Sequence, residues 1–263
     1  MIEAIDFGKM YIEHKKASTF KGKKADDWDE RAESMSKKVI DSPYTAEFIS
    51  KMNLDGCESI LDVGCGPGTI ALAVADKMKT VSGLDFSKGM LQQFVQNGQQ
   101  RGVNVNPIYK SWEDEWYDIE RHDIVVASRS IEVRDLRDAV KKLNSKANKA
   151  VYVTYKAGGS FVDIDILEYI GKDIVSRPDY MYLLLILREM GIYAKLDFID
   201  TPDGSISYDN KEVFLNSLGW SLGGLEEEHI QKAEEFYDRF ISKGLFKPKG
   251  FKWAFVHWDK ASS

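Results

Sequence analysis

The chain has few of the residues that build disulfide-rich and metal-binding proteins. Its 263 residues include two cysteines, Cys57 and Cys65, and four histidines. The cysteines flank a predicted extended strand, which holds them farther apart than the ~7 Å Cα separation that a disulfide allows. We therefore expect reduced thiols and no metal site.

Long apolar runs and an excess of positive charge are also missing. The longest apolar run, residues 181–187, is far shorter than the ~20 residues that cross a bilayer. The first residues lack a basic start followed by an apolar stretch, so export is not expected. The formal net charge of -6 disfavours broad binding to nucleic acid. These absences predict a cytoplasmic protein that binds neither a membrane nor nucleic acid.

What is present fits one globular domain. Hydrophobic residues make up 43% of the chain and charged residues 30%, which is an ordinary balance for a protein with a buried core. The length suits one α/β domain with additions better than two independent domains. The sequence also shows no internal repeat.

Strand-length apolar runs alternate with helical segments from residue 44 to residue 155. Alternation of this kind predicts parallel strands joined by right-handed crossovers, hence an α/β, Rossmann-like, doubly wound and mostly parallel sheet. The apolar character of the later strands suits a sheet that is covered on both faces. We expect strands at residues 59–63, 80–84, 105–109, 123–127 and 150–155, and helices at 44–52, 69–78, 88–101 and 136–144.

The segments on either side of this pattern have different roles. Residues 1–42 are expected to be an N-terminal extension, helical at 28–40, which acts as a lid over the domain of residues 43–263. Residues 157–194 and 203–248 are expected to be cover segments. The second of these contains predicted helices at 211–218 and 226–242, and strands at 195–199 and 252–258 are predicted to close the sheet as a C-terminal antiparallel hairpin.

The strongest local signal is a glycine-rich loop directly after the first strand. Gly64, Gly66 and Gly68 stand at alternate positions at a predicted strand-to-helix junction. Glycines there let the backbone turn tightly and let a ligand approach main-chain N–H groups. Asp85 ends the next strand about 20 residues further on, where an acid can accept hydrogen bonds from ribose hydroxyls. The pattern predicts a site for a nucleotide-like ligand.

Two ligand classes fit this loop. Residues 66–71 also satisfy the dinucleotide pattern G-x-G-x-x-G/A, so an NAD-dependent oxidoreductase is one alternative. Asp62, two residues before Gly64, would repel a pyrophosphate and attract a ligand that ends in an ammonium group. This favours S-adenosylmethionine as the cofactor. A donor-binding module without catalysis is the other alternative.

Residues 62–69 and 84–91 resemble motifs I and II of the class I S-adenosylmethionine-dependent methyltransferases, especially the small-molecule group that includes the quinone C-methyltransferases. The resemblance covers residues 44–155. It implies that the glycine loop holds the methionine part of the donor, that the acid after the second strand holds the ribose, and that residues after the third and fourth strands face the adenine and the sulfonium. The residues that the resemblance implies are Asp62, Gly64, Gly66, Gly68, Asp85, Phe86, Met90, Ser111, Trp112, Glu113, Ser128 and Arg129. Cys65 in the loop and Trp28 in the extension are further candidates for donor binding.

One of these positions departs from the family pattern. Ser111 stands where many relatives carry Asp, whose carboxylate accepts from the adenine amino group. Glu113 is the candidate replacement for that carboxylate.

The methyl acceptor is constrained mainly by exclusion. Residues 127–130 do not resemble the Asn/Asp-Pro-Pro-Tyr/Phe turn of amino-group methylases, and two cysteines are too few for arsenic methylation. The resemblance to the small-molecule group implies a small-molecule acceptor, and a homodimer is compatible with the sequence. Because an activated methyl group needs no enzyme nucleophile, no catalytic residue is assigned. The candidates are His14, Arg129 and Tyr180, whereas His122, His229 and His257 are expected to be structural or solvated.

Overall fold

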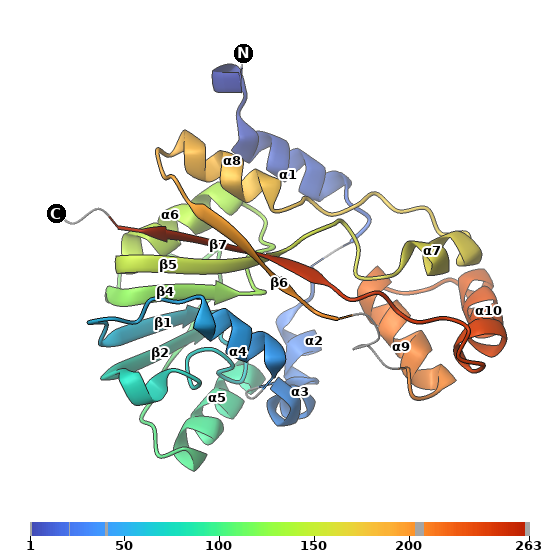
Figure 1. The fold of residues 1–263 in the computed structure, drawn as a ribbon, viewed down its shortest axis with the longest axis horizontal. Helices are drawn as coiled ribbons and strands as arrows, with labels where there is room; N and C mark the ends of the chain where they lie inside the picture. The colour runs from blue at the N-terminus through green and yellow to red at the C-terminus, as the bar shows by residue number, and fades with distance from the viewer. Residues whose placement is uncertain (1, 21, 40–41, 203–207, 261–263) are drawn as a thin grey trace.

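The computed structural model describes residues 2–20, 22–39, 42–202 and 208–260 (Figure 1). The expected helix end at Ile40, the first residue of the expected N-terminal extension and the start of the expected cover segment at residue 203 lie outside the described residues.

Within the described residues, seven strands form one sheet in the order β3-β2-β1-β4-β5-β7-β6. Strand β7 runs antiparallel to β5 and β6, and the other neighbouring pairs are parallel. This confirms the mostly parallel, Rossmann-like sheet with a closing antiparallel hairpin. The strands are β1 (Ser59–Val63), β2 (Thr80–Asp85), β3 (Asn106–Tyr109), β4 (His122–Ser128), β5 (Ala147–Lys156), β6 (Lys195–Asp200) and β7 (Lys252–Asp259).

Several helices begin where the sequence offers a side chain that can accept from their first free N–H groups. Ser42, Ser87, Asp135 and Asn210 each accept a hydrogen bond from the backbone three residues ahead. The α-helices are α1 (Phe7–Ala17), α2 (Ala25–Asp29), α3 (Ala32–Val39), α4 (Pro43–Ser50), α5 (Lys88–Gln100), α6 (Leu136–Lys146), α7 (Ile164–Ile170), α8 (Met181–Glu189), α9 (Lys211–Leu222) and α10 (Glu227–Phe236). Short turns of other helix types are η1 (Ile2–Ala4), η2 (Ala75–Lys77) and η3 (Tyr237–Ile241).

The prediction of a helix at residues 69–78 is wrong. A series of turns follows the glycine loop and ends in the short η2. Gly68 has a φ of 93°, which is incompatible with an α-helix, and the backbone N–H of Ala71 donates to the carboxylate of Asp62 rather than to a helical carbonyl. The glycine loop is therefore not backed by a helix N-terminus.

The helix predicted at 28–40 is interrupted instead of continuous. It divides into α2 and α3 at a turn formed by Glu30 and Arg31. The interruption coincides with two tertiary contacts: Asp29 binds the start of α5, and the Arg31 guanidinium lies 3.5 Å from the centroid of the Trp220 ring. The helix predicted at 226–242 is likewise α10 followed by the π-helical turn η3.

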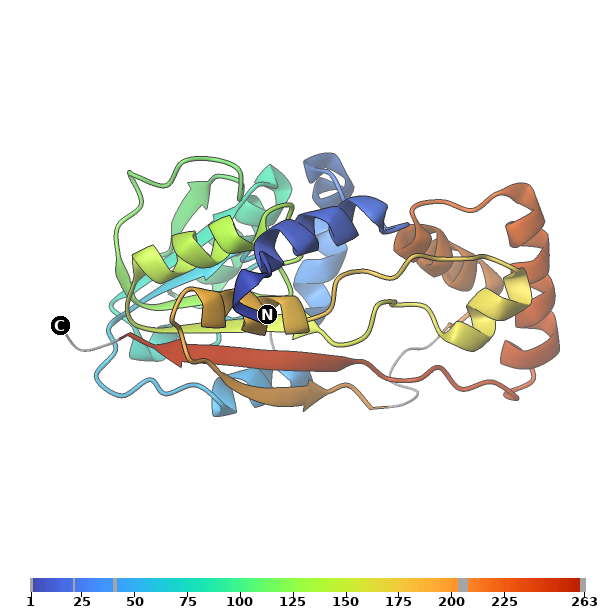
Figure 2. The same ribbon diagram turned by 90° about the horizontal axis from the view of Figure 1, so that it is seen from above.

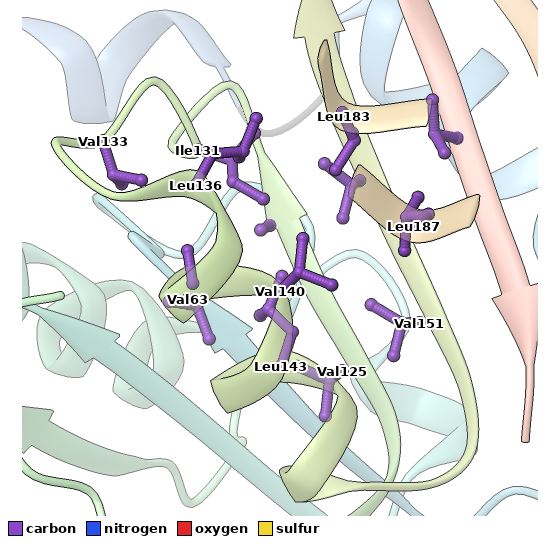
Figure 3. Close-up of a cluster of buried hydrophobic side chains, with 14 of the residues drawn as sticks. Val63, Val125, Ile131, Val133, Leu136, Val140, Leu143, Val151, Leu183 and Leu187 are labelled. Atoms are coloured by element: carbon purple, nitrogen blue, oxygen red, sulfur yellow. The ribbon is translucent and has the colours of Figure 1, made fainter. Parts of the chain in front are cut away.

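Apolar side chains cover both faces of the sheet, as expected for buried parallel strands. On one face α6 and α8 pack on the strands, and Figure 3 shows Val140 and Leu143 of α6 beside Val125 and Val151. Helix α1 lies beside α8 on this face (Figure 2). On the other face Phe48 of α4 and α5 pack with the turns after β1. Each fully buried Leu or Val contributes ~1.5–3 kcal/mol to folding.

A third apolar cluster joins α7, α9 and α10 into a helical lobe, which lies beyond the carboxyl ends of the parallel strands (Figure 1). Phe20 from the extension is part of this cluster. Both cysteines are free and buried. Within the described residues, no helix is both long and apolar enough for a membrane span.

Candidate functional site

The glycine loop lies at the carboxyl edge of the sheet, directly after β1. Its three glycines all have a positive φ, 68° at Gly64, 53° at Gly66 and 93° at Gly68. A Cβ on Gly64 would lie 2.4 Å from the Cβ of Ser130, and one on Gly68 would lie 2.5 Å from the ring of Phe94. These two glycines are therefore required by the protein's own packing, whatever the loop binds.

Gly66 has a different environment. The nearest atom to a Cβ built there is the sulfur of Met90, at 3.9 Å. Met90 is only 2% exposed and Phe86 is half-buried, yet neither belongs to the three hydrophobic clusters found among the described residues. The side of the loop that faces Phe86 and Met90 can thus accept a flat apolar group next to exposed backbone.

Asp85 fixes the loop to the end of β2. Its side chain is 6% exposed; one carboxylate oxygen accepts from Gly66 N at 2.9 Å and the other from Ser87 N at 2.9 Å. Burial raises the pKa of Asp85, and the backbone donors oppose that rise. A carboxylate has about four acceptor positions, so two remain for hydroxyl groups of a ligand.

Asp62 lies beneath the loop and is also buried. One of its oxygens accepts from the backbone N–H of Ala71 at 3.1 Å. Burial raises the pKa of Asp62 to about 7, while the N–H donor and the charge of Arg129 act in the opposite direction. Asp62 therefore holds the irregular turns after β1 in place, a task that is separate from any attraction to a ligand.

Asp29 of α2 is part of this region and was missed by the sequence analysis. Its carboxylate accepts from Gly89 N at 2.8 Å and from the hydroxyl of Ser87. A Cβ on Gly89 would lie 3.1 Å from the Cα of Asp29. The extension thus touches the first turn of α5. No local signal could reveal this, because the two partners are far apart in the sequence.

The residues after β3 are held by contacts within the protein. The backbone N–H and hydroxyl of Ser111 both donate to the carboxylate of Asp114, at 2.7 and 3.0 Å. The indole N–H of Trp112 donates to the carbonyl oxygen of Ser130 at 3.1 Å, and the Trp112 ring lies 5.4 Å from that of Trp116. Glu113 is exposed. Trp112 therefore fixes the position of the Ser130 backbone beside Gly64.

Arg129, directly after β4, has an unusual backbone. Its φ of 59° is the one positive value at a non-glycine residue in the described parts of the chain. Its N–H donates to the hydroxyl of Thr154 at 3.0 Å, and its guanidinium lies 4.3 Å from the centroid of the Tyr44 ring. The Tyr44 hydroxyl is 2.8 Å from that of Ser128. Backbone strain held by several contacts is characteristic of functional sites.

The other predicted site residues make contacts outside the glycine loop. Trp28 packs edge-on against Trp220 at 5.4 Å, and Tyr180 packs against Phe198 at 5.7 Å. The Nδ1 of His14 is 3.2 Å from the hydroxyl of Tyr182. The side chain of Cys65 is buried in the core, so this loop residue can offer only its backbone to a ligand.

Two surface hollows lie elsewhere on the molecule. One of about 530 Å³ is lined by Phe7, Arg137 and Glu189, between α1 and α8. Another of about 400 Å³ is lined by Ser82 and His122 at the amino edge of the sheet, where His122 Nε2 is 2.8 Å from the Ser82 hydroxyl. Neither includes the glycine loop, whose position at the carboxyl edge is where open α/β sheets bind ligands.

The strand order, the antiparallel β7 and the glycine loop paired with Asp85 together define a Rossmann-like protein of the class I methyltransferase fold. Comparisons with known proteins agree. The sequence family described as "Methyltransferase domain" matches residues 60–149. The chain is 37% identical over 259 residues to an uncharacterized protein from Haemophilus influenzae, with 97% of each chain covered. It is 27% identical over 108 residues to a ubiquinone biosynthesis O-methyltransferase from Coxiella burnetii, with 41% of this chain and 46% of that protein covered.

Two solved structures show the same fold. The YcgJ protein from Bacillus subtilis superposes with a TM-score of 0.58 at 16% identity, covering 84% of this chain and 99% of that one. Coclaurine N-methyltransferase, bound to N-methylheliamine and S-adenosylhomocysteine, superposes with a TM-score of 0.52 at 12% identity, covering 98% and 96%. The chain belongs to the class I S-adenosylmethionine-dependent methyltransferases, in one family with the Haemophilus protein. Its cofactor is S-adenosylmethionine, and the NAD-dependent alternative is set aside.

Proposed function

We propose that this enzyme transfers the methyl group of S-adenosylmethionine to a small-molecule acceptor, with the donor bound over the glycine loop. The observation that carries the donor site is the open side of Gly66: among the described residues, only the sulfur of Met90, at 3.9 Å, comes within 4 Å of a Cβ built there, and Asp85 holds the Gly66 N–H. An adenosyl group has the ribose hydroxyls that an acid can accept from and the flat base that Phe86 and Met90 can contact.

Each residue of the donor site has a distinct proposed task. Asp85 accepts from the ribose hydroxyls, and Gly66 lets the methionine part approach the backbone. Ser111, Trp112 and Glu113 after β3 face the adenine, and Ser128 at the end of β4 faces the sulfonium. Asp62 attracts the ammonium group as well as bracing Ala71. Gly64, Gly68 and the Cys65 backbone give the loop its shape.

Bound S-adenosylmethionine supplies an already activated methyl group, so the protein has to align the acceptor, exclude water and, for a hydroxyl or carbon acceptor, remove a proton. His14, Arg129 and Tyr180 are the candidates for these tasks. Arg129 lies at the end of β4, and the Nε2 of His14 is 3.0 Å from the carbonyl oxygen of Ser176. The acceptor is proposed to be a small molecule because the relative from Coxiella acts in ubiquinone biosynthesis and motifs I and II resemble those of small-molecule enzymes.

We also propose that residues 1–42 form a lid over the donor, with the domain proper at 43–263 and covers at 157–194 and 203–248. The contact between Asp29 and Gly89 supports this, because it ties the extension to the helix that follows Asp85. Trp28 packs on Trp220 of the helical lobe. In this proposal Trp28 lies at the hinge of the lid and does not face the donor.

Calorimetric titration with S-adenosylhomocysteine and with NAD tests the donor site. We expect binding of S-adenosylhomocysteine in the micromolar range and none of NAD. Binding of NAD without binding of S-adenosylhomocysteine would refute the proposal.

A further inference from the structure

A cluster of charged and polar side chains lies beside the proposed donor site and takes no part in it. It comes from α1, the loop after β4, the end of β5 and the segment before α8. Its members, called the polar cluster below, are Lys15, Glu132, Tyr155, Lys156, Arg177 and Asp179.

The contacts of the polar cluster are specific. Arg177 Nη1 is 2.9 Å from a carboxylate oxygen of Glu132, and the ammonium group of Lys15 is 4.0 Å from the same oxygen. Lys156 is 5% exposed and donates to the carbonyl oxygens of Ala157 at 3.0 Å and Gly158 at 3.3 Å. An ammonium group has three protons, so the third proton of Lys156 is left for another acceptor.

Three atoms of the polar cluster are buried and lack a hydrogen-bond partner among the described residues: the Tyr155 hydroxyl, Arg177 Nε and one carboxylate oxygen of Asp179. Tyr155 is 1% exposed. The neighbouring hydroxyl of Tyr11 donates its proton to the carbonyl oxygen of Val133 at 2.6 Å, so it can act toward Tyr155 only as an acceptor. Buried polar groups are nearly always satisfied, and such a group without a partner calls for an explanation.

The charges of the polar cluster do not balance. Three cations, Lys15, Lys156 and Arg177, face two carboxylates, Glu132 and Asp179. Burial lowers the pKa of Lys15 and of Lys156, the charge of Arg177 acts in the same direction, and the attraction of Glu132 opposes both. Aromatic rings surround the cations: Arg177 lies 4.6 Å from the Phe20 centroid, and Lys156 lies 5.1 Å from that of Phe161. One further negative charge would neutralise the group.

The polar cluster lies beside the strand ends that flank the proposed donor site. Lys156 follows two residues after Thr154, whose hydroxyl accepts from the backbone of Arg129 at the end of β4. The N–H of Arg177 donates to the carbonyl oxygen of Gly159 at 3.0 Å, so the segment before α8 runs along the chain that leaves β5 (Figure 1). A molecule bound here would lie next to Ser128 and Arg129.

We propose that the polar cluster binds a carboxylate group of the methyl acceptor, an inference that rests on the proposed function. The Tyr155 hydroxyl, Arg177 Nε and the ammonium group of Lys156 each have a proton to donate, and a carboxylate accepts several such hydrogen bonds and carries one negative charge. The free oxygen of Asp179 accepts from a hydroxyl group of the same molecule. The acceptor is therefore a hydroxylated small carboxylic acid.

Ligand pairs that differ only in the carboxylate test the proposal. The protein is first titrated with S-adenosylhomocysteine, and the saturated protein is then titrated with benzoate, 3-hydroxybenzoate and hexanoate and with the corresponding amides. At least one carboxylate is expected to bind tenfold or more tightly than its amide. Phenyl phosphate, which carries up to two charges, is expected to bind more weakly than the best carboxylate.

Two matched variants test whether the preference for a carboxylate comes from the polar cluster. Tyr155→Phe removes one hydroxyl from the polar cluster and should weaken carboxylate binding at least threefold with little change for the amide. Tyr152→Phe removes a hydroxyl from the opposite face of the same strand, where it contacts Asn53, and should leave carboxylate binding unchanged.

Equal binding of every carboxylate and its amide, a preference for phenyl phosphate, or unchanged binding in Tyr155→Phe would overturn the inference. If S-adenosylhomocysteine binds normally in that experiment, only the carboxylate site is wrong. If S-adenosylhomocysteine itself does not bind, the donor site and the inference that rests on it both fail.

Discussion

The carboxylate of Asp29 accepts a hydrogen bond from the backbone N–H of Gly89 at 2.8 Å, which joins the N-terminal extension to the first turn of α5. The same carboxylate accepts from the hydroxyl of Ser87, whose N–H donates to Asp85. A short chain of hydrogen bonds thus connects the extension to the acid proposed to hold the ribose.

Asp29→Ala should weaken the binding of S-adenosylhomocysteine about threefold to tenfold. The substitution removes an acceptor at a helix N-terminus, an interaction that typically contributes ~1 kcal/mol. Calorimetry measures the affinity, and Asp26→Ala on the same helix is the control. If Asp29→Ala and the wild type bind S-adenosylhomocysteine with equal affinity, the contact between the extension and α5 does not contribute to donor binding.

Binding of S-adenosylhomocysteine should protect the extension from hydrogen exchange if the extension is a lid. Water must be excluded before methyl transfer, and lids are drawn from weakly packed parts of a fold. Exchange followed by mass spectrometry should show slower exchange at residues 8–20 and 22–35. Protection confined to the glycine loop and Asp85 would make the extension a fixed strut and refute the lid.

Asp85→Ala should weaken donor binding by ~1.5–3 kcal/mol, the scale of hydrogen bonds between a charged group and hydroxyls. Because Asp85 also accepts from Gly66 N and Ser87 N, circular dichroism must show that the variant is folded. A dissociation constant that matches the wild type in a folded variant would rule out the ribose role.

The glycines of the loop should respond differently to substitution by alanine. Gly64→Ala places a methyl group 2.4 Å from Ser130 and should lower the melting temperature strongly. Gly66→Ala adds its methyl group on the open side, so it should destabilise the fold by only ~1 kcal/mol for the positive φ while it weakens donor binding more than tenfold. Thermal unfolding and calorimetry of both variants separate the two effects. If Gly66→Ala binds the donor normally, the donor does not approach the loop there.

Asp62 should make the free protein less stable as the pH rises. Its folded-state pKa is about 7, above the ~3.9 of an unfolded Asp, so between these values the folded state holds a proton that the unfolded state has lost. The contribution is fully present below the unfolded pKa and is lost as the pH rises through the folded pKa. Urea unfolding from pH 4 to pH 8 should show this decline, reduced in Asp62→Asn. Identical pH profiles would place the folded pKa of Asp62 near its usual value.

The sequence by itself determined the elements whose signals are local. Apolar runs such as Ile60–Val63 have strand length and can be buried only in a covered sheet, so β1, β2, β4 and β5 were predicted within a few residues. The alternation with helices predicted parallel pairing, because a crossover that contains a helix returns the chain in the same direction. The spacing of Gly64, Gly66 and Gly68 before Asp85 predicted that this loop and Asp85 meet, because each follows or ends one of two neighbouring parallel strands.

Only the tertiary structure decided what depends on partners distant in the chain. The segment after Gly68 has helical composition but forms turns, in which the N–H of Leu72 donates to the carbonyl of Gly68 and that of Ala73 to the carbonyl of Ile70, while the buried Asp62 carboxylate accepts from Ala71. Asp29 meets Gly89, and Trp28 meets Trp220, through contacts that no spacing rule describes. Lys156 ends a buried strand, which is an unusual place for a charge, and the charges of Glu132 and Arg177 come near it only when the loops after β4 and before α8 fold together. Side chains that converge from separate loops leave no periodic pattern in the sequence, since their proximity is fixed by packing of the whole domain.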